Sequence, residues 1–320
     1  MATASLKSAV QLPSGQWMTA EDFQVLLTSG TDEVMKRGFD TSKFPFQMSM
    51  FYDDFSLNKA SYTFQDTLGT GNIPRNRDGQ TLTYEPQSLG FAHSWSSVQY
   101  RKAIGWTREL LEDELYGQLT DNSEELMTSS RRTVELIAAD GVNRAMGPSG
   151  AAPVLCNDGG YWLDSDRPNP NPTAATWSNL ESTGAISQSS IWTAALNFRL
   201  HKNSHGDKEP IRLSQIIIRP QDEPAIKETL MSTLRPTDSM NAINYLNDMG
   251  FTYSVYDHMT AAQIMYRATG MRNEVKALWR VRPNVAPVNV EDPDTFAVRV
   301  RFRFGLGLGR PDIWRGGTVT

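Results

Sequence analysis

The stretch from Phe296 to Gly309, FAVRVRFRFGLGLG, has a period of two along its whole length. Every second residue from Phe296 to Leu308 is apolar, and such alternation is typical of a β-strand with one buried face. The residues between them change from arginine to glycine: Arg299, Arg301, Arg303, then Gly305, Gly307 and Gly309. The stretch therefore predicts a long strand whose second face is first positively charged and then open to a close neighbour.

The composition allows a large core and excludes several kinds of site. The chain has 320 residues, 39% of them hydrophobic, which fits one large domain or two smaller ones. Its net charge of -5 does not favour nucleic-acid binding by bulk charge, so any such contact would be local. Cys156 is the only cysteine, which excludes an internal disulfide and a metal site of several cysteines. No segment has the apolar length of a signal peptide or a membrane helix, so we expect a soluble protein made in the cytoplasm.

Two helical patterns follow one another in the first half of the chain. TRELLEDELYGQL, residues 107–119, has the leucine spacing of an amphipathic helix. Asp121, with Glu124 three residues later, has the spacing of a capping box. The pattern continues to about Met146, where Gly147 and Pro148 end it. We therefore predict a long second helix from Asp121 to Met146.

The second half alternates helix and strand patterns. We predict a helix from Ser187, a strand at Leu213–Pro220 and a helix from Asp222. Shorter elements are expected at 249–256 and 261–266. A strand at Glu274–Pro283 would pair antiparallel with the strand that contains Arg299.

Residues 59–104 have no helical period and are rich in Thr, Ser, Tyr and Gly. Two short alternations flank a segment of turn residues: Tyr62 with Phe64, and Leu82 with Tyr84. We predict a long hairpin whose tip lies near 74–79. A hairpin with so few apolar residues is not stable alone, so it must pack on its own body or on another chain. The preceding residues, with a short helix at Thr19–Gly30, are interpreted as an arm.

Nothing in the sequence has the spacing of a catalytic or ligand-binding site. The glycines of GLGLG are not followed by a helix, as a dinucleotide loop requires, so we interpret them as positions of close packing. His201 and His205 lack the glutamate of a zinc-protease motif and are interpreted as a solvated helix end. Cys156 has no activating neighbour in sequence and is interpreted as a buried structural thiol. We therefore predict no enzyme activity, no cofactor and no metal.

The order of these parts resembles the major capsid protein of tailed bacteriophages, which has the Hong Kong 97-type fold. Two phrases carry the resemblance: AIGWTRELLEDE at Ala103–Glu114, and VEDPDTFAVRVRFRFGLGLGRPDIW at Val290–Trp314. The resemblance covers nearly the whole chain. It implies an α+β fold with an N-terminal arm, an E-loop hairpin, a P-domain interrupted in sequence and built on a long spine helix, and an A-domain.

The resemblance also implies domain boundaries. These are an arm and lead-in at 1–58, the E-loop at 59–104, the first part of the P-domain at 105–150, the A-domain at 151–273, and the second part of the P-domain at 274–320. The P-domain loop would be Asn284–Thr295.

The implied function is a shell. Hexamers and pentamers of the chain would form an icosahedral capsid around double-stranded DNA, without sequence-specific binding or contact with a membrane. The capsid would be part of the virion and be assembled in the host cytoplasm with a portal, a separate scaffolding protein and, where the virus has one, a cement protein. The residues expected at contacts between subunits are Arg75, Arg77, Asp78, Glu291, Asp292, Asp294, Arg299, Arg301 and Arg303.

One departure from the family and two alternatives stay open. Some members cross-link an E-loop lysine to an asparagine of the closing strand, but here Arg299 stands at that strand position and the hairpin tip carries arginines. We therefore predict no covalent cross-link. The first alternative is an encapsulin, a nanocompartment shell of the same fold. A more distant one is a β-rich carbohydrate-active enzyme or tail lectin, which the many aromatic residues would suit.

Overall fold

The computed structural model describes residues 46–69, 71–73, 75, 78–79, 81, 84, 88–107, 116–147, 154–171, 175–181, 184–234, 243–288 and 295–319. The chain divides into two compact units. The first unit consists of Met1–Phe46, Val98–Val134 and Val281–Phe304, and the second of Gln47–Ser97, Glu135–Arg280 and Gly305–Thr320. The predicted arm at 1–45, with its helix at Thr19–Gly30, lies outside the described residues.

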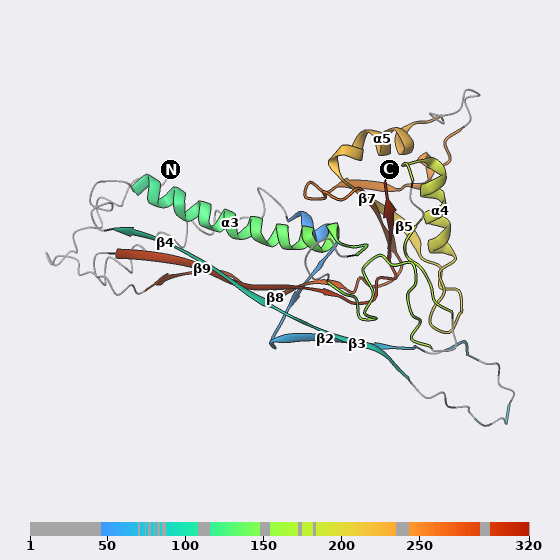
Figure 1. Ribbon diagram of the computed structural model, residues 1–320. Coiled ribbons are helices and arrows are strands. Elements are labelled where there is room, and N and C mark those ends of the chain that lie inside the picture. Colours follow the sequence, from blue (N-terminus) through green and yellow to red (C-terminus); the bar gives the residue numbers. More distant parts are fainter. Residues whose placement is uncertain are drawn as a thin grey trace. The chain divides into compact units, whose positions relative to one another are not determined.

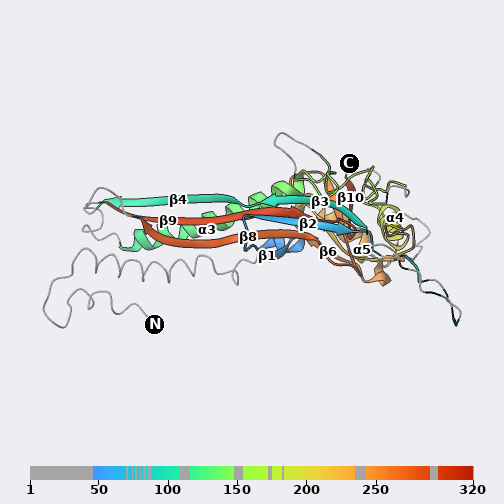
Figure 2. The same ribbon diagram turned by 90° about the horizontal axis from the view of Figure 1, so that it is seen from below.

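A long helix, α3 (Tyr116–Asn143), dominates the first unit and continues into the second. Figures 1 and 2 show it running alongside strands β4 (Val98–Thr107) and β9 (Thr295–Leu308). The long helix was predicted, but its start at Asp121 was wrong, because α3 begins at Tyr116 and includes Leu119. A single aspartate inside a helix costs only a fraction of a kcal/mol, so Asp121 does not interrupt it.

Strand β9 belongs to a four-stranded sheet with the order β1-β8-β9-β4. Strand β1 (Asp53–Ser56) pairs parallel with β8 (Val275–Val288), and β4 pairs antiparallel with β9. Figure 2 shows β8, β9 and β4 side by side as long strands. The predicted strand at Glu274–Pro283 is confirmed as β8, and it lies next to β9 as expected.

The second unit contains another four-stranded sheet, with the order β10-β7-β5-β6. Its strands are β5 (Arg212–Ile218), β6 (Thr252–Val255), β7 (Gln263–Thr269) and β10 (Trp314–Thr318). Strand β7 is antiparallel to both β5 and β10, whereas β5 and β6 are parallel. Besides the end of α3, this unit contains the helices α4 (Gln188–Arg199) and α5 (Glu223–Met231), and short 3-10 helices occur at Gln47–Met50, Pro220–Asp222 and Asn247–Met249.

Most elements predicted for this unit are confirmed. Helix α4 begins after Ser187, whose side chain and that of Ser190 form a reciprocal capping box. Strand β5 and helix α5 lie where the patterns placed them. The core is aromatic: the ring of Phe51 lies 5.5 Å from that of Trp314 and 5.1 Å from that of Tyr256. Such pairs add to the free energy of area burial.

The predicted hairpin is confirmed in part. Strands β2 (Ser61–Thr67) and β3 (Leu89–Ser96) pair antiparallel, with Tyr62 opposite Trp95. The return strand was expected near Leu82–Tyr84, but Tyr84 lies outside any strand. The residues after Ser97 are also not part of the hairpin, because they form β4 and pair with β9. Apart from Lys102, the residues of β4 that lie opposite the apolar residues of β9 are themselves apolar: Val98, Tyr100, Ile104 and Trp106.

The base of the hairpin is fixed to the second unit by a small apolar cluster. Trp95 and Leu278 are buried in it, and Phe55, Tyr62 and Phe64 pack against it. The indole nitrogen of Trp95 also donates to the carbonyl of Leu155 at 3.0 Å. The base is therefore held in place by contacts that sequence patterns do not show.

Candidate assembly surfaces

The paired strands β4 and β9 present an arginine face, formed by Arg101, Arg299, Arg301 and Arg303. Arg101 lies directly opposite Arg301 in the register, and Arg299 and Arg303 flank this pair along β9. Arg101, Arg299 and Arg301 are exposed, and Arg303 is half-buried. On the opposite face the residues of β9 are buried, and the rings of Tyr100 and Phe302 stack 5.1 Å apart. The predicted strand with one apolar and one basic face is confirmed.

The arginine face has no acidic counterpart among the described residues. Within that part of the chain, none of its four arginines forms an ion pair with a carboxylate. The Nε atom of Arg303 is buried without a hydrogen-bond acceptor. Like charges directly opposite each other on neighbouring strands are destabilising. This surface would thus be stabilised by an anionic partner.

The glycine half of β9 is already in close contact with other residues of the second unit, whereas the arginine half forms no ion pair within the described chain. A Cβ atom on Gly305 would lie 2.7 Å from the carbonyl oxygen of Ser96, and one on Gly309 would lie 2.7 Å from Cβ of Glu274. A Cβ atom on Gly307 would meet Leu278 Cδ1 at 3.2 Å. Contacts this short exclude a side chain without movement. The interpretation of GLGLG as close packing is confirmed.

The hairpin exposes apolar residues that nothing in the described chain covers. Ile73 is 95% exposed, Tyr84 88% and Leu89 70%. Arg75 and Asp78, predicted contact residues, are also exposed. Arg77 and the acidic residues Glu291, Asp292 and Asp294 lie outside the described residues, so their predicted pairing stays a prediction. These three side chains and the two charged ones are therefore available for contact with another molecule.

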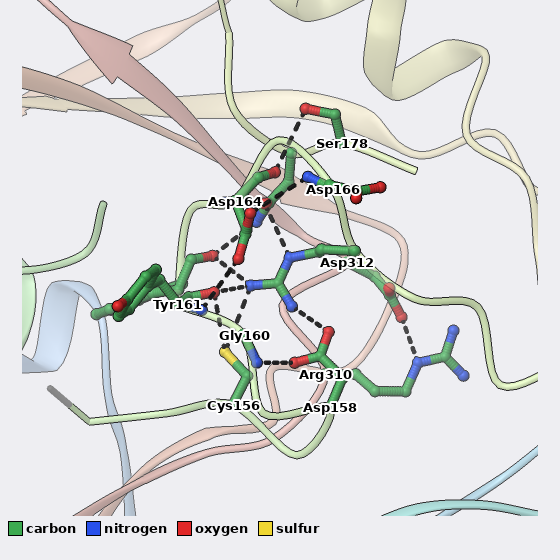
Figure 3. Close-up of polar contacts among 12 residues, drawn as sticks. Cys156, Asp158, Gly160, Tyr161, Asp164, Asp166, Ser178, Arg310 and Asp312 are labelled. Atoms are coloured by element: carbon green, nitrogen blue, oxygen red, sulfur yellow. Dashed lines mark hydrogen bonds and ion pairs between the residues drawn. The ribbon is translucent and has the colours of Figure 1, made fainter. Parts of the chain in front are cut away.

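Arg167 organises the loop between Val154 and Glu181, and sequence analysis missed it. Its side chain is fully buried and forms an ion pair with Asp158 at 2.6 Å. It also donates to Asn179 Oδ1 at 2.9 Å and to the carbonyls of Tyr161 and Trp162. Figure 3 shows polar contacts of this loop, among them those of Asp158, Tyr161 and Asp164 close to Cys156. The signal in the sequence was only an arginine at the start of a proline-rich run.

A second arginine, Arg310, links the segment before β10 to strand β2 of the same unit. It pairs with Asp312 at 2.8 Å and with Asp66 of β2 at 3.4 Å. Burial raises the pKa of Asp66 above its ordinary value, and the charge of Arg310 opposes this shift. The phrase GRPDIW therefore has a structural role at the base of the hairpin.

Two residues singled out by sequence lie near these arginines. Cys156 is buried as predicted, and burial raises its pKa to about 11. A thiol with such a pKa is almost entirely protonated at neutral pH and reacts slowly. His201 was expected at a solvated helix end, but it is 6% exposed and its ring lies 5.6 Å from that of Trp177. The error arose because the chain folds back after α4, where the backbone N–H of Glu209 donates to the carbonyl of His201.

Within the described residues no group of three or more His, Cys, Asp and Glu side chains could hold a metal ion. In the same part of the chain, none of the helices combines the length and apolar character that crossing a bilayer requires.

No protein-family model and no curated protein matches the chain. Solved structures do. A structure of Mycobacterium phage Patience is 10% identical with a TM-score of 0.55, over 97% of this chain and 91% of that one. The capsid of cyanophage P-SCSP1u is 11% identical with a TM-score of 0.53, over 84% and 86%. The holo-SrpI encapsulin from Synechococcus elongatus is 10% identical with a TM-score of 0.50, over 86% and 87%.

At an identity of 10–11% the comparison shows similarity of fold alone. The similarity covers most of this chain and most of each of the three structures. The chain has the α+β fold of these shell proteins, the Hong Kong 97-type capsid fold.

Proposed function

We propose that this protein is the major capsid protein of a tailed bacteriophage. In this proposal hexamers and pentamers of the chain form an icosahedral shell around double-stranded DNA. The observation that carries it is a capsid fold in which, within the described chain, the hairpin exposes Ile73, Tyr84 and Leu89 and the arginine face forms no ion pair. Surfaces of this kind are stabilised when copies associate, and many weak contacts per subunit make assembly cooperative. The protein would have a structural and not an enzymatic role.

The proposal assigns the parts of the chain. Residues 59–104 would contain the E-loop, of which β2 and β3 are the base, and 151–273 would be the A-domain. The P-domain would combine 105–150, with α3 as spine helix, and 274–320. A separate scaffolding protein, a portal and, where the virus has one, a cement protein would be the partners in assembly.

The test is to express the chain with and without a candidate scaffolding protein and to examine the product by size-exclusion chromatography and negative-stain electron microscopy. We expect capsomers or closed shells of megadalton size. A stable small oligomer in both cases would contradict the proposal and favour the enzyme or lectin alternative.

The proposal pairs Arg75 and Arg77 at the hairpin tip with the acidic loop of a neighbouring subunit, which contains Glu291, Asp292 and Asp294. The exposure of Arg75 supports it. Reversing both charges, with Arg75→Glu and Arg77→Glu, should lower the yield of assembled particles at least several-fold, because opposed pairs become like charges. An unchanged yield would count against the pairing.

The encapsulin fold of the Synechococcus structure supports a second candidate, a nanocompartment shell that houses protein. The contents of purified particles distinguish the two. Nuclease-protected DNA in particles from infected or induced cells would support the capsid, whereas a co-purifying enzyme without DNA would support the compartment.

A further inference from the structure

We propose that the arginine face binds an acidic run of a second copy of this chain, Glu109–Glu114. This inference rests on the proposed function, because it names the partner of one assembly surface. The run ELLEDE contains four carboxylates in six residues, and the arginine face contains four guanidinium groups. The described residues leave those groups without ion pairs, and the run carries the opposite charge.

The geometry of the face suits a compact anionic partner. Successive residues on one face of a strand are about 7 Å apart, so Arg299 and Arg303 are about 14 Å apart along β9. Arg101 lies beside Arg301 at the centre. Ala103 and Gly105 of β4 add only small side chains to the exposed face at the Arg299 end, and Gln99 lies opposite Arg303 at the other end. A partner segment can therefore approach closely.

Charge within the chain favours a carboxylate partner. The whole chain has a net charge of -5, so the chain without the four arginines of this face has a net charge of -5 - 4 = -9. Arginine binds carboxylates with two parallel hydrogen bonds, which suits exposed guanidinium groups. The net negative charge of the rest of the chain would repel a nucleic acid that approaches the face, so a nucleic acid is the less favoured partner.

The attachment of the run favours a second copy over the same copy. The run begins two residues after Thr107, the end of β4. Strand geometry places Thr107 about 20 Å from Arg101, and Gln99, the partner of Arg303, about 27 Å away. The run is also held at its other end by α3, which begins at Tyr116. A second copy has no such tether and can cover the whole face.

The experiment uses two charge-reversed full-length proteins. The first carries Arg101→Glu, Arg299→Glu and Arg301→Glu, and the second carries Glu112→Lys, Asp113→Lys and Glu114→Lys. Each alone should lose association at least tenfold, measured by light scattering during chromatography in 0.1 M salt. An equimolar mixture should recover most of it, because each protein then offers an intact surface to the other.

A matched control reverses three exposed charges elsewhere, with Lys202→Glu, Lys208→Glu and Arg212→Glu, and should associate like the wild type. Near-ultraviolet circular dichroism of each variant checks that it is folded. If the mixture stays unassociated while one chain with all six reversals associates, the contact lies within one copy and the inference is overturned. It is also overturned if the first variant assembles normally but loses DNA binding.

Rescue in the mixture supports the inference even if the associated species are small. That outcome, with no closed shells from any protein, would contradict the proposed function and leave this contact standing. If the wild-type protein forms closed shells but the mixture does not recover association, the proposed function stands and this contact is overturned.

Discussion

At the scale of single residues, Arg167 is the most consequential side chain in the second unit. It sits with no exposed surface between Asp158, Asn179 and two backbone carbonyls, and its guanidinium lies 5.6 Å from the ring of Trp177. Desolvation lowers the pKa of Arg167, but the nearby Cys156 and Asp158 raise it by more than this. The net pKa is therefore above its ordinary value, and the side chain stays charged. The charge is thus tolerated only because every partner is present.

Replacing this arginine by Arg167→Met should therefore lower the free energy of unfolding by about 3–5 kcal/mol, since Asp158 is left buried without its partner. Urea unfolding of unassembled protein, followed by tryptophan fluorescence, measures the change. The matched variant Arg219→Met removes a more exposed ion pair with Asp222 and should cost less than about 1 kcal/mol. Equal losses in the two variants would contradict the assigned role.

The glycines of β9 allow a second residue-scale prediction. In Gly305→Ala the new methyl group meets the backbone oxygen of Ser96, which cannot move without disturbing the chain before β4. We expect a loss of about 1–3 kcal/mol in the free energy of unfolding. In Gly307→Ala the nearest atom to the methyl group is Cδ1 of Leu278 at 3.2 Å, a longer contact that involves a side chain and not the backbone. Its effect should stay within about 1 kcal/mol, because alanine also lowers the entropy of the unfolded chain.

Differential scanning calorimetry of the two alanine variants gives the comparison directly. A Gly307→Ala protein that is less stable than Gly305→Ala would show that the close approach of Ser96 is not what excludes a side chain.

The scale of elements shows what sequence reasoning can reach. Local signals were sufficient for α4, α5, β5 and β9, because each carries its period and its end signals within a few residues. The pairing of β4 could not be read in this way, since its partner lies about 200 residues away along the chain. The same limit hid Arg167 and the burial of His201, because both depend on contacts between distant segments.

Helix α4 offers a test of a local signal. Ser187 accepts a hydrogen bond from the backbone of Ser190, whose side chain accepts one in return. Ser187→Ala removes half of this box and should lower the free energy of unfolding by about 1 kcal/mol. Ser187→Asp keeps an acceptor at the same position and should be nearly neutral. Thermal unfolding followed by circular dichroism distinguishes them, and two equally unstable variants would contradict the capping role.

On the scale of the whole molecule, two surfaces of the described chain expose groups that a partner would cover. The hairpin exposes Ile73, Tyr84 and Leu89, and the arginine face lacks anions. Composition did not predict this, because 39% hydrophobic residues suffice for an ordinary core. The information came from alternation, which assigns residues to faces, and from the register, which adds Arg101 to the arginines of β9.

The assembled particle should be held together without covalent bonds. The hairpin tip has arginines at 75 and 77, and Arg299 stands in the closing strand, so the lysine and asparagine of a cross-link are missing there. Boiling purified particles in detergent should therefore release monomer of 35.8 kDa on an electrophoresis gel. A ladder of multimers that survives reduction and boiling would refute this.

The second face of strand β9 changes from arginine to glycine between Arg303 and Gly305, while its first face stays apolar. Each residue of the strand must therefore keep an even or an odd position in the alternation. Inserting one amino acid at this junction would exchange the faces of everything after it, and Leu306 and Leu308 would take the places of the glycines. Inserting two would lengthen the strand but keep each side chain on its own side. In natural variants, insertions and deletions at this junction should therefore add or remove an even number of residues, whichever amino acids they are.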